Sequence, residues 1–383
     1  MEKLVIIGAN DFQNQLILKA KSLGYETHVF AWQDGAVGEK NADFFYPISI
    51  IEKELILEEC KKIKPVGVCS IASDLASITV NYVAEQLGLP CNSTEYTQIQ
   101  TNKYAMRQAL AEVGIPCPKF LIADENTDFE VELRDFKFPI IVKPTDRSGS
   151  RNIMKLDSSE ETADAVKAAC GSSFEHKAIV EEYLFGDEYS METISYKGKH
   201  TYLATTKKFT TGAPNFIETG HIQPSGLPEA TLEKAKEQIF SALTALHIEN
   251  SAGHSEFKVD ENGNIHIIEI GARMGGDCIG SDLVYLSTGN DFVKMVIDVA
   301  CGNEPDIKSP ANNKAEIRFI FNEDDLNEFY KFSKDFPDVV YRASDFELDN
   351  LGKVTDSSTR IGYYILRSKN YGFINNYTML LFG

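Results

Sequence analysis

The stretch HSEFKVDENGNIHIIEIGARMGG, residues 254–276, decides both the fold and the chemistry of this chain. Apolar runs flank Asn262-Gly263, and this dipeptide favours a two-residue type I′ turn between antiparallel strands. With that turn, Glu256 lies directly opposite Glu269. Because like charges that face each other across a strand pair are destabilising, a cation between the two carboxylates is the natural explanation.

The ligand preferences of metal ions indicate which cation this is. Hard divalent ions take oxygen ligands, and Mg²⁺ is usually held by one or two carboxylates together with substrate phosphates. A solvated acidic hairpin is the simpler alternative. We favour the metal site because Phe257, Val259 and Ile268 would form the core-facing side of the two strands. The two glutamates then share the other side, although a longer turn would shift this register by one residue.

The residues after the second glutamate strengthen the same interpretation. Gly271, Gly275 and Gly276 surround Arg273. Glycine lets the backbone approach a ligand closely, and arginine supplies a permanent positive charge with several donors. This part of the chain therefore predicts a site for a metal and an anionic ligand.

Composition limits the remaining choices. The 383 residues, 43% of them hydrophobic, are enough for two or three domains with their own cores. The formal net charge of −19 argues against a nucleic-acid partner and against an anionic membrane surface, since both require clustered Lys and Arg. A small anionic ligand stays compatible with this charge only if its site gathers cations locally.

Cysteine usage and the shortness of the apolar runs indicate the cellular compartment. The seven cysteines are scattered, with no Cys-x-x-Cys spacing, so neither a disulfide framework nor a zinc site is expected. The apolar run at the N-terminus is too short for a signal peptide, and no run approaches the roughly 20 residues of a membrane span. We expect a cytoplasmic protein.

The first 95 or so residues alternate short apolar runs with helical patterns. Strands are expected at LVIIG, ETHVFAW and VGVCSIA, and helices near residues 11–23, 53–63 and 75–87. This order predicts a parallel, Rossmann-like sheet of the doubly wound type. Gly8 opens only a partial glycine fingerprint, GANDFQNQ, so a dinucleotide site is not favoured here.

A second stretch with strong chemical character follows a helix expected over residues 101–114. In FPIIVKPTDRSGSRNIMKL, Lys143 ends an apolar strand, and the loop of residues 146–152 places Ser148, Gly149 and Ser150 between two arginines. Small residues let backbone N–H groups point at phosphate oxygens, and the lysine adds a fixed positive charge. A solvated hairpin loop with incidental basic residues is an equally good interpretation of this stretch alone.

The rest of the chain mixes strands with one long helix over about residues 228–246. Strands are expected at AEIRFIF, DVVYRA, STRIGYYILRS and TMLLF in the tail. Arg360 and its neighbours are most simply the edge of a sheet, and we assign them no role.

The order of these motifs resembles the ATP-grasp superfamily over nearly the whole chain. The resemblance implies an α/β and α+β fold, in which an N-terminal Rossmann-like parallel sheet precedes a two-subdomain ATP-grasp unit. It implies the following division: an N-terminal domain over residues 1–97, a linker helix over 98–118, a small lid subdomain over 119–186, and a large subdomain with the metal and substrate site over 187–383.

The resemblance also implies roles for the nucleotide and metal residues. Lys103 and Lys143 look like the two lysines that contact the phosphates of ATP, with Ser148, Gly149 and Ser150 in the phosphate loop. Glu256 and Glu269 look like the paired ligands of Mg²⁺, or alternatively of Mn²⁺. The family often has Asn two residues after the second glutamate, and here that position is Gly271, so the third ligand is left open. The strand that meets the adenine through backbone groups looks like Glu181, Glu182, Tyr183 and Leu184, and the ribose-binding acid looks like Glu188.

Within the superfamily, GHSEF and EIGARMGGD most resemble the L-amino acid ligases, close to carbamoyl phosphate synthase-like and purine-pathway proteins. The implied reaction phosphorylates a carboxylate with ATP and lets an amine attack the acyl phosphate. Positioning and charge neutralisation by Mg²⁺ and lysines suit the first step. Arg273 with the N–H groups of Gly275 and Gly276 suits the second, because its tetrahedral oxyanion needs donors.

Contacts to the substrates are predicted with alternatives. Asp277 either pairs with the amino group of an amino acid or caps a helix. His254 either lines the acceptor site or is a structural histidine. One of the adjacent lysines Lys207 and Lys208, with Lys207 as the first candidate, reaches the γ-phosphate. Glu218 and His221, in a polar stretch typical of an active-site loop, are candidates for contact with substrate.

Three functions remain open. The first is an ATP-dependent carboxylate-amine ligase acting on small molecules, expected to be amino acids. The second is a carboxylase of the purine or biotin type that uses bicarbonate, and the third is a non-catalytic nucleotide-binding protein. Because ATP-grasp proteins are often dimers, a homodimer is an expectation of the resemblance.

Overall fold

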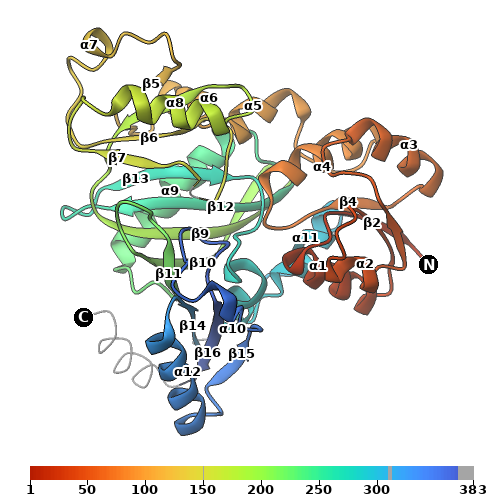
Figure 1. Cartoon of the computed structure of the whole chain (residues 1–383). Coiled ribbons are helices and arrows are strands. Elements are labelled where there is room, and N and C mark those ends of the chain that lie inside the picture. The colour runs from red at the N-terminus through yellow and green to blue at the C-terminus, as the bar shows by residue number, and fades with distance from the viewer. Residues whose placement is uncertain (150, 309–312, 370–383) are drawn as a thin grey trace.

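The computed structural model describes residues 1–149, 151–308 and 313–369, which form three sheets (Figure 1). Two sequence expectations, the phosphate-loop residue Ser150 and the strand TMLLF at 378–382, lie outside the described residues. Among the described residues, none of the helices is both long and apolar enough to cross a membrane.

The N-terminal sheet is parallel, with strand order β3-β2-β1-β4 (Figure 1). Its central strands are buried apolar runs, as expected for a sheet covered on both faces. The strands and their helices are β1 (Lys3–Ile7), α1 (Asp11–Ser22), β2 (Glu26–Phe30), α2 (Val37–Asn41), β3 (Phe44–Tyr46), α3 (Lys53–Ile63), β4 (Gly67–Cys69) and α4 (Asp74–Leu87). The predicted parallel, doubly wound sheet is confirmed.

The space next to Gly8, in the partial glycine fingerprint, is occupied by a side chain of the protein itself. Asn10 caps α1 by accepting from the N–H of Gln13. The buried Gln13 side chain bonds to the backbone of Ile71, and a Cβ at Gly8 would lie 2.8 Å from Cγ of Gln13. A side chain of the chain therefore packs directly over the glycine, where a dinucleotide phosphate would have to lie.

The linker contains two helices where one was expected. They are α5 (Thr97–Thr101) and α6 (Lys103–Glu112), after the short 3-10 turn η1 (Thr94–Tyr96). Asn102 separates them, because its side chain accepts from the N–H groups of Tyr104 and Ala105 and so starts a new helix. This break places Lys103 in the first turn of α6.

The small sheet is antiparallel, in the order β5-β8-β6-β7, and α8 packs on it. Its elements are β5 (Phe120–Ala123), α7 (Phe129–Glu132), β6 (Ile140–Pro144), β7 (Met154–Leu156), α8 (Thr162–Ser172) and β8 (Ala178–Glu182). In β6 and β8, Ile141 pairs with Glu181 and Lys143 with Ile179. The strand-end lysine and the adenine-strand residues therefore lie on adjacent strands.

The large sheet has the order β13-β12-β9-β10-β11-β14-β16-β15, and its β14, β16 and β15 end extends to the bottom of Figure 1 beside α12. Its strands are β9 (Asp187–Tyr196), β10 (Lys199–Thr210), β11 (Glu218–Gln223), β12 (Ser251–Val259), β13 (Ile265–Gly271), β14 (Lys314–Ile320), β15 (Val340–Ala343) and β16 (Gly362–Ser368). Its helices are α9 (Glu229–Ala245), the π-helix η2 (Ile279–Leu283), α10 (Val284–Thr288), α11 (Phe292–Ala300), α12 (Glu323–Asp335) and the 3-10 turn η3 (Leu348–Asn350).

The hairpin β12–β13 brings Glu256 opposite Glu269 as predicted, but by a different route. The predicted two-residue turn is wrong. Asp260 pairs with Asn264 around a three-residue loop, in which Gly263 has a φ of +76°. This loop shifts the register by one, and a bulge between Glu256 and Phe257 shifts it back.

The bulge also changes where one isoleucine points. Ile268, expected on the core side, lines the cavity instead, while Ile267 and Ile270 are fully buried in the core. An apolar residue and the metal-type Glu269 therefore face the cavity at consecutive positions, which strict strand alternation does not allow.

The N-terminal sheet is fixed to the large sheet through α11. Its core residues, including Leu4 and Ile17, belong to the same buried apolar cluster as Val293 and Ile297 of α11. Lys19 adds an ion pair to Asp291. Burial of this shared core holds the two parts together, so residues from both can contribute to one site.

Candidate active site

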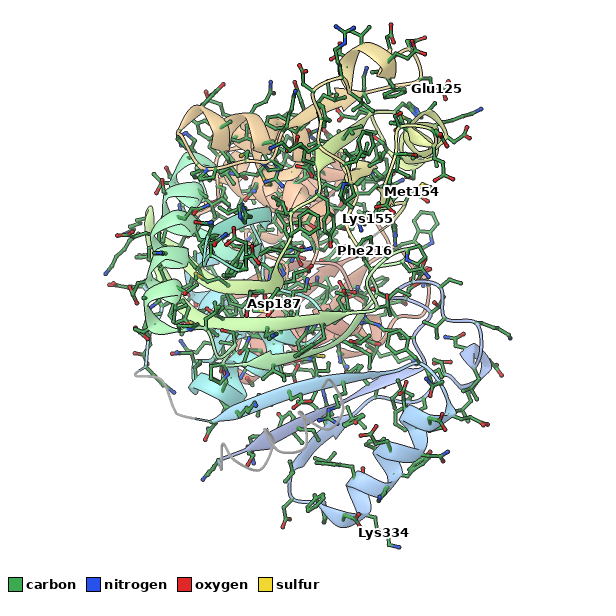
Figure 2. All side chains as sticks on the ribbon, turned by 90° about the vertical axis from the view of Figure 1, so that its left-hand side faces the viewer. Glu125, Met154, Lys155, Asp187, Phe216 and Lys334 are labelled. Atoms are coloured by element: carbon green, nitrogen blue, oxygen red, sulfur yellow. The ribbon has the colours of Figure 1, made fainter. Side chains whose placement is uncertain are left out.

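One cavity between the small and large sheets is lined by most of the predicted site residues. In the view of Figure 2, Met154, Lys155 and Phe216 lie between Glu125, which follows β5 of the small sheet, and Lys334 of α12. The predicted residues that line the cavity are Lys103, Lys143, Ser148, Gly149, Glu181, Glu182, Tyr183, Leu184, Glu188, Glu218, His254, Glu256, Glu269 and Arg273.

The cavity gathers positive charge in a protein whose formal net charge is −19. Its lining contains more lysine and arginine side chains than carboxylates. The basic ones are Lys103, Arg107, Lys143, Arg147, Arg151, Lys208, Lys258 and Arg273. Such a local excess of cations is what an acidic protein needs to bind a polyanion such as a nucleotide triphosphate.

Lys143 is held by a buried carboxylate at the inner wall. Its Nζ lies 2.7 Å from Oε2 of Glu181, whose other oxygen contacts Arg107. Burial alone would raise the pKa of Glu181, but the two cations lower it to about 2. We expected only backbone contacts from Glu181, yet its side chain orients the predicted phosphate lysine.

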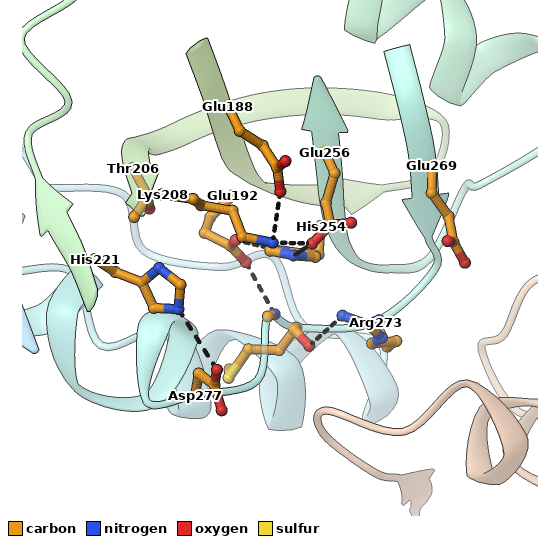
Figure 3. Close-up of polar contacts among 12 residues, drawn as sticks. Glu188, Glu192, Thr206, Lys208, His221, His254, Glu256, Glu269, Arg273 and Asp277 are labelled. Carbon is orange, nitrogen blue, oxygen red and sulfur yellow. Dashed lines mark hydrogen bonds and ion pairs between the residues drawn. The ribbon is translucent and has the colours of Figure 1, made fainter. Parts of the chain in front are cut away.

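Each metal-type glutamate is neutralised by a lysine. Lys103 Nζ lies 2.9 Å from Oε1 of Glu269, and Lys208 contacts Glu256 (Figure 3). Burial of Glu256 would raise its pKa, but Lys208 and His254 hold it well below its usual range. Both carboxylates keep part of their surface open, with 26% and 25% of the side chain exposed, so a cation can reach them from the cavity.

Lys208, not the candidate Lys207, faces the phosphate side of the cavity. Successive side chains of β10 point to opposite faces. Lys207 therefore lies on the far side, where its Nζ pairs with Asp187 at 2.9 Å, and it does not line the cavity. Lys208 is buried and lies 3.4 Å from Oε1 of Glu188 as well as against Glu256.

The site fits a metal that arrives with its own oxygen ligands. Within residues 1–149, 151–308 and 313–369, no group of three or more His, Cys, Asp or Glu side chains could hold a metal ion. Two facing carboxylates completed by phosphate oxygens match the usual coordination of Mg²⁺.

The structure gives a physical reason for glycine at position 271. A Cβ there would lie 3.0 Å from both Nε of Arg273 and Oδ1 of Asp74. The ion pair between these residues, 2.8 Å from Nε to Oδ1, occupies the space that a third ligand side chain would need.

Arg273 lines the cavity and is anchored to the N-terminal domain. Its guanidinium forms a two-point pair with Asp74 of α4, with distances of 2.8 and 3.1 Å. Although burial lowers the pKa of Arg273, Asp74 raises it above its usual value, so the side chain stays charged. Such planar pairing fixes the direction of the remaining N–H donors.

The two glycines after Arg273 are placed differently from our expectation. The N–H of Gly275 donates to Oε2 of the buried Glu192 at 3.0 Å, so it is not free to bind an oxyanion. Neither Gly275 nor Gly276 lines the cavity. The prediction that they supply oxyanion donors is therefore wrong for Gly275 and has no geometric support at Gly276.

His254 is part of a buried network that the sequence interpretation missed. Its Nδ1 contacts Glu192, directly across the β9–β12 pair, and its Nε2 lies 3.3 Å from Oε1 of Glu256 (Figure 3). Burial would lower the pKa of His254, but Glu192 raises it to about 9. Strand alternation was the available signal, because it puts Glu188, Ser190 and Glu192 on one face of β9.

Asp277 is paired within the protein. Arg360 holds both its oxygens, at 2.7 and 3.1 Å, and Nε2 of His221 lies 3.5 Å away. Burial would raise the pKa of Asp277, but Arg360 and His221 lower it. Neither Asp277 nor His221 lines the cavity, and Cys278, not Asp277, stands at the start of η2. The predicted helix-cap role for Asp277 is therefore wrong, and its contact with a substrate amino group stays a prediction.

Arg360, to which we assigned no role, connects Asp277 to β11 and β14. Its guanidinium stacks 3.6 Å over the Phe319 ring and donates to the carbonyl of Glu218. Ser357, from the same loop, donates to Oε2 of Glu218 at 2.7 Å. Sequence distance hid this role, because the loop and β11 are far apart in the chain.

One part of the cavity, beside the predicted adenine strand, is apolar enough to bind a flat base. Ile141, Ile153 and Ile268 line it beside Tyr183 and Leu184. A second lysine, Lys258, donates to the Tyr183 hydroxyl at 3.1 Å. Glu182, by contrast, uses its side chain to accept from the N–H of Lys137 on the outer surface.

The predicted phosphate loop forms part of the cavity wall. Ser148 and Gly149 line it, with Gly149 at a φ of +75°. The carbonyl of Arg147 accepts from Nζ of Lys103 at 2.6 Å, and Asp146 accepts from the N–H groups of Phe174 and Glu175. These bonds tie the loop to α6 and to the turn that follows α8.

Comparison with known proteins gives a family match and several relatives. Residues 136–282 match the ATP-grasp domain family. The alanine–anticapsin ligase of Bacillus subtilis is 27% identical over 300 residues, which cover 70% of this chain. The match spans only 63% of the length of that ligase.

Solved structures show the same fold over almost the whole chain. An L-amino acid ligase from Bacillus licheniformis matches with a TM-score of 0.80 at 21% identity, covering 98% of this chain and 96% of that one. An N5-carboxyaminoimidazole synthetase from Staphylococcus aureus, complexed with ADP, matches with a TM-score of 0.79 at 15% identity, covering 100% and 97%. These likenesses confirm the predicted fold.

Proposed function

We propose that this chain, whose residues 136–282 match the ATP-grasp domain family, is an ATP- and Mg²⁺-dependent carboxylate-amine ligase that forms an acyl phosphate intermediate. One observation carries the proposal: Glu256 faces Glu269 inside a cavity rich in cations. Two carboxylates in this position suit Mg²⁺ held jointly with phosphates. The likeness to the two amino acid ligases supports amino acids as substrates.

The nucleotide would lie along the cavity from the isoleucine end toward Arg273. Lys143, Lys103 and the loop at Ser148 would surround the phosphates, and Glu188 would reach the ribose hydroxyls. Mg²⁺ at the two glutamates would neutralise charge on the phosphates and hold them in line for transfer. Lys208 would then be free to leave Glu256 and contact phosphate oxygens.

The carboxylate chemistry would take place near Arg273. A substrate carboxylate attacks the γ-phosphate and ADP leaves, and an amine then attacks the acyl carbon and releases phosphate. Since the N–H of Gly275 is used by Glu192, the remaining guanidinium donors of Arg273 are the best candidates for the oxyanion. Glu218 also lines the cavity and would offer a carboxylate to the substrate's amino group.

Phosphate release from ATP, measured with Mg²⁺ and pairs of amino acids, tests this proposal. We expect at least one pair to stimulate release well above either amino acid alone, with formation of a dipeptide detectable by mass. If no pair exceeds the single acids, the ligase acting on two amino acids is excluded.

A carboxylase using bicarbonate is the second candidate, favoured by the likeness in fold to the N5-carboxyaminoimidazole synthetase. The same assay separates the two, because only the carboxylase needs bicarbonate for release of ADP. A non-catalytic nucleotide-binding protein would release no phosphate under either condition.

A further inference from the structure

Glu192 is a buried carboxylate between two parts of the site, and it touches neither the cavity nor solvent. Its side chain is 0% exposed, and it lies in the middle of β9 directly opposite His254 of β12. A buried charge is costly unless it is paired and hydrogen-bonded. Glu192 meets this requirement with one oxygen on each of two partners.

The first partner is the loop that carries Arg273. Oε2 of Glu192 accepts from the N–H of Gly275 at 3.0 Å, two residues beyond Arg273. The contact is closely packed, because a Cβ at Gly275 would lie 2.7 Å from Nδ1 of His254 and 2.8 Å from Oε1 of Glu192. The loop can therefore take this position only with glycine at 275.

The second partner leads to the metal-type glutamate. Oε1 of Glu192 contacts Nδ1 of His254, and Nε2 of His254 lies 3.3 Å from Oε1 of Glu256 (Figure 3). An unbroken series of polar contacts thus runs from the Gly275 backbone through Glu192 and His254 to Glu256. Arg273 itself is held on its other side by Asp74.

We infer that Glu192 is a positioning residue, which sets the distance between the Arg273 loop and Glu256. This inference rests on the proposed function, in which phosphate transfer at Glu256 and bond formation at Arg273 act on one substrate. A misplacement of about 1 Å can cost about 10²-fold in rate, so a fixed spacing matters more for turnover than for binding. Glu192 itself touches no ligand, since it does not line the cavity.

Glu192→Gln tests the inference, because the neutral amide accepts a weaker hydrogen bond from Gly275 and removes the charge that holds His254. We expect kcat to fall by about 30-fold, with KM for ATP and the affinity for MgADP changed less than about threefold. Gly275→Ala should give the same pattern, because its Cβ displaces the same pair.

The matched control is Glu316→Gln. Glu316 is also 0% exposed and pairs with Arg318 in β14 of the same sheet, away from the cavity. It should lower stability without changing kcat. If Glu192→Gln leaves kcat unchanged, or lowers nucleotide affinity as much as kcat, the inference is wrong.

A readout without turnover separates this inference from the proposed function. Hydrogen exchange of the peptide containing Gly275 should be at least tenfold faster in Glu192→Gln, with MgADP bound, than in the wild type or Glu316→Gln. If the wild type releases no phosphate with any substrate, the proposed function fails, and exchange alone then decides. Unchanged exchange would overturn the positioning role.

Discussion

The two ends of the cavity differ in how their predicted residues are used. At the nucleotide end, Lys143, Glu256 and Glu269 line the cavity as expected, and their charges are paired in ways a ligand can replace. At the predicted substrate end, Gly275 and Asp277 do not line the cavity and are bonded instead to Glu192 and Arg360 inside the protein. The comparison teaches that strand residues present their chemistry to the cavity by alternation, whereas loop residues are assigned by partners from distant segments.

The largest effect is expected from removing a charge at the nucleotide end. Glu269→Gln should lower ATP-dependent phosphate release by at least about 10³-fold, because the metal would lose half of its protein carboxylates. Lys103 would also lose its partner. Glu316→Gln, a buried glutamate far from the cavity, is the control in a phosphate-release assay. Retention of more than about a tenth of the wild-type rate would contradict the metal assignment.

Arg273 tests the boundary between the two ends. Arg273→Lys keeps the charge but cannot form the two-point pair with Asp74, so we expect a loss of about 10²–10³ in kcat. ADP affinity, measured by calorimetry, should stay within about threefold. A variant that binds ADP poorly would instead place Arg273 among the nucleotide contacts.

The adjacent lysines of β10 give a matched pair of variants. Lys208→Met should reduce kcat/KM for ATP by about 10–100-fold, because it removes a buried cation beside Glu256 and Glu188. Lys207→Met should change it by less than about twofold, since its partner Asp187 is mostly exposed. Equal losses of kcat/KM in the two variants would contradict the assignment of Lys208 alone to the phosphate side of β10.

Arg360→Leu tests the substrate end through stability. It leaves Asp277 buried without its main partner, and we expect about 2–3 kcal/mol of destabilisation in urea unfolding at pH 7. The pKa of Asp277 is lowered in the folded state, so its pairing stabilises the protein above the ordinary carboxyl pKa and is lost as pH falls.

The difference between the Arg360→Leu variant and the wild type should therefore shrink as the pH is lowered below about 4. A difference that stays constant with pH would mean that lost packing on Phe319, not the ion pair, explains the destabilisation.

The sequence alone determined the class of fold, the facing of Glu256 and Glu269, and the strand that carries Lys143. These features depend on local periodicity and on charges a few residues apart in a hairpin, which are visible in one stretch of chain. Even there, the predicted turn at Asn262-Gly263 was one residue too short. A bulge at Ile268 restored the register, so that Glu256 still faces Glu269.

Only the tertiary structure decided which groups are free to act. The Asp74–Arg273 pair leaves no room for a side chain at Gly271, Glu192 accepts the N–H of Gly275, and Arg360 pairs with Asp277. Asp74, Glu192 and Arg360 all come from segments far away in the sequence. A buried charge or donor needs a partner, and the partner is set by how strands and domains pack against each other. No pattern within a single strand or loop contains that information.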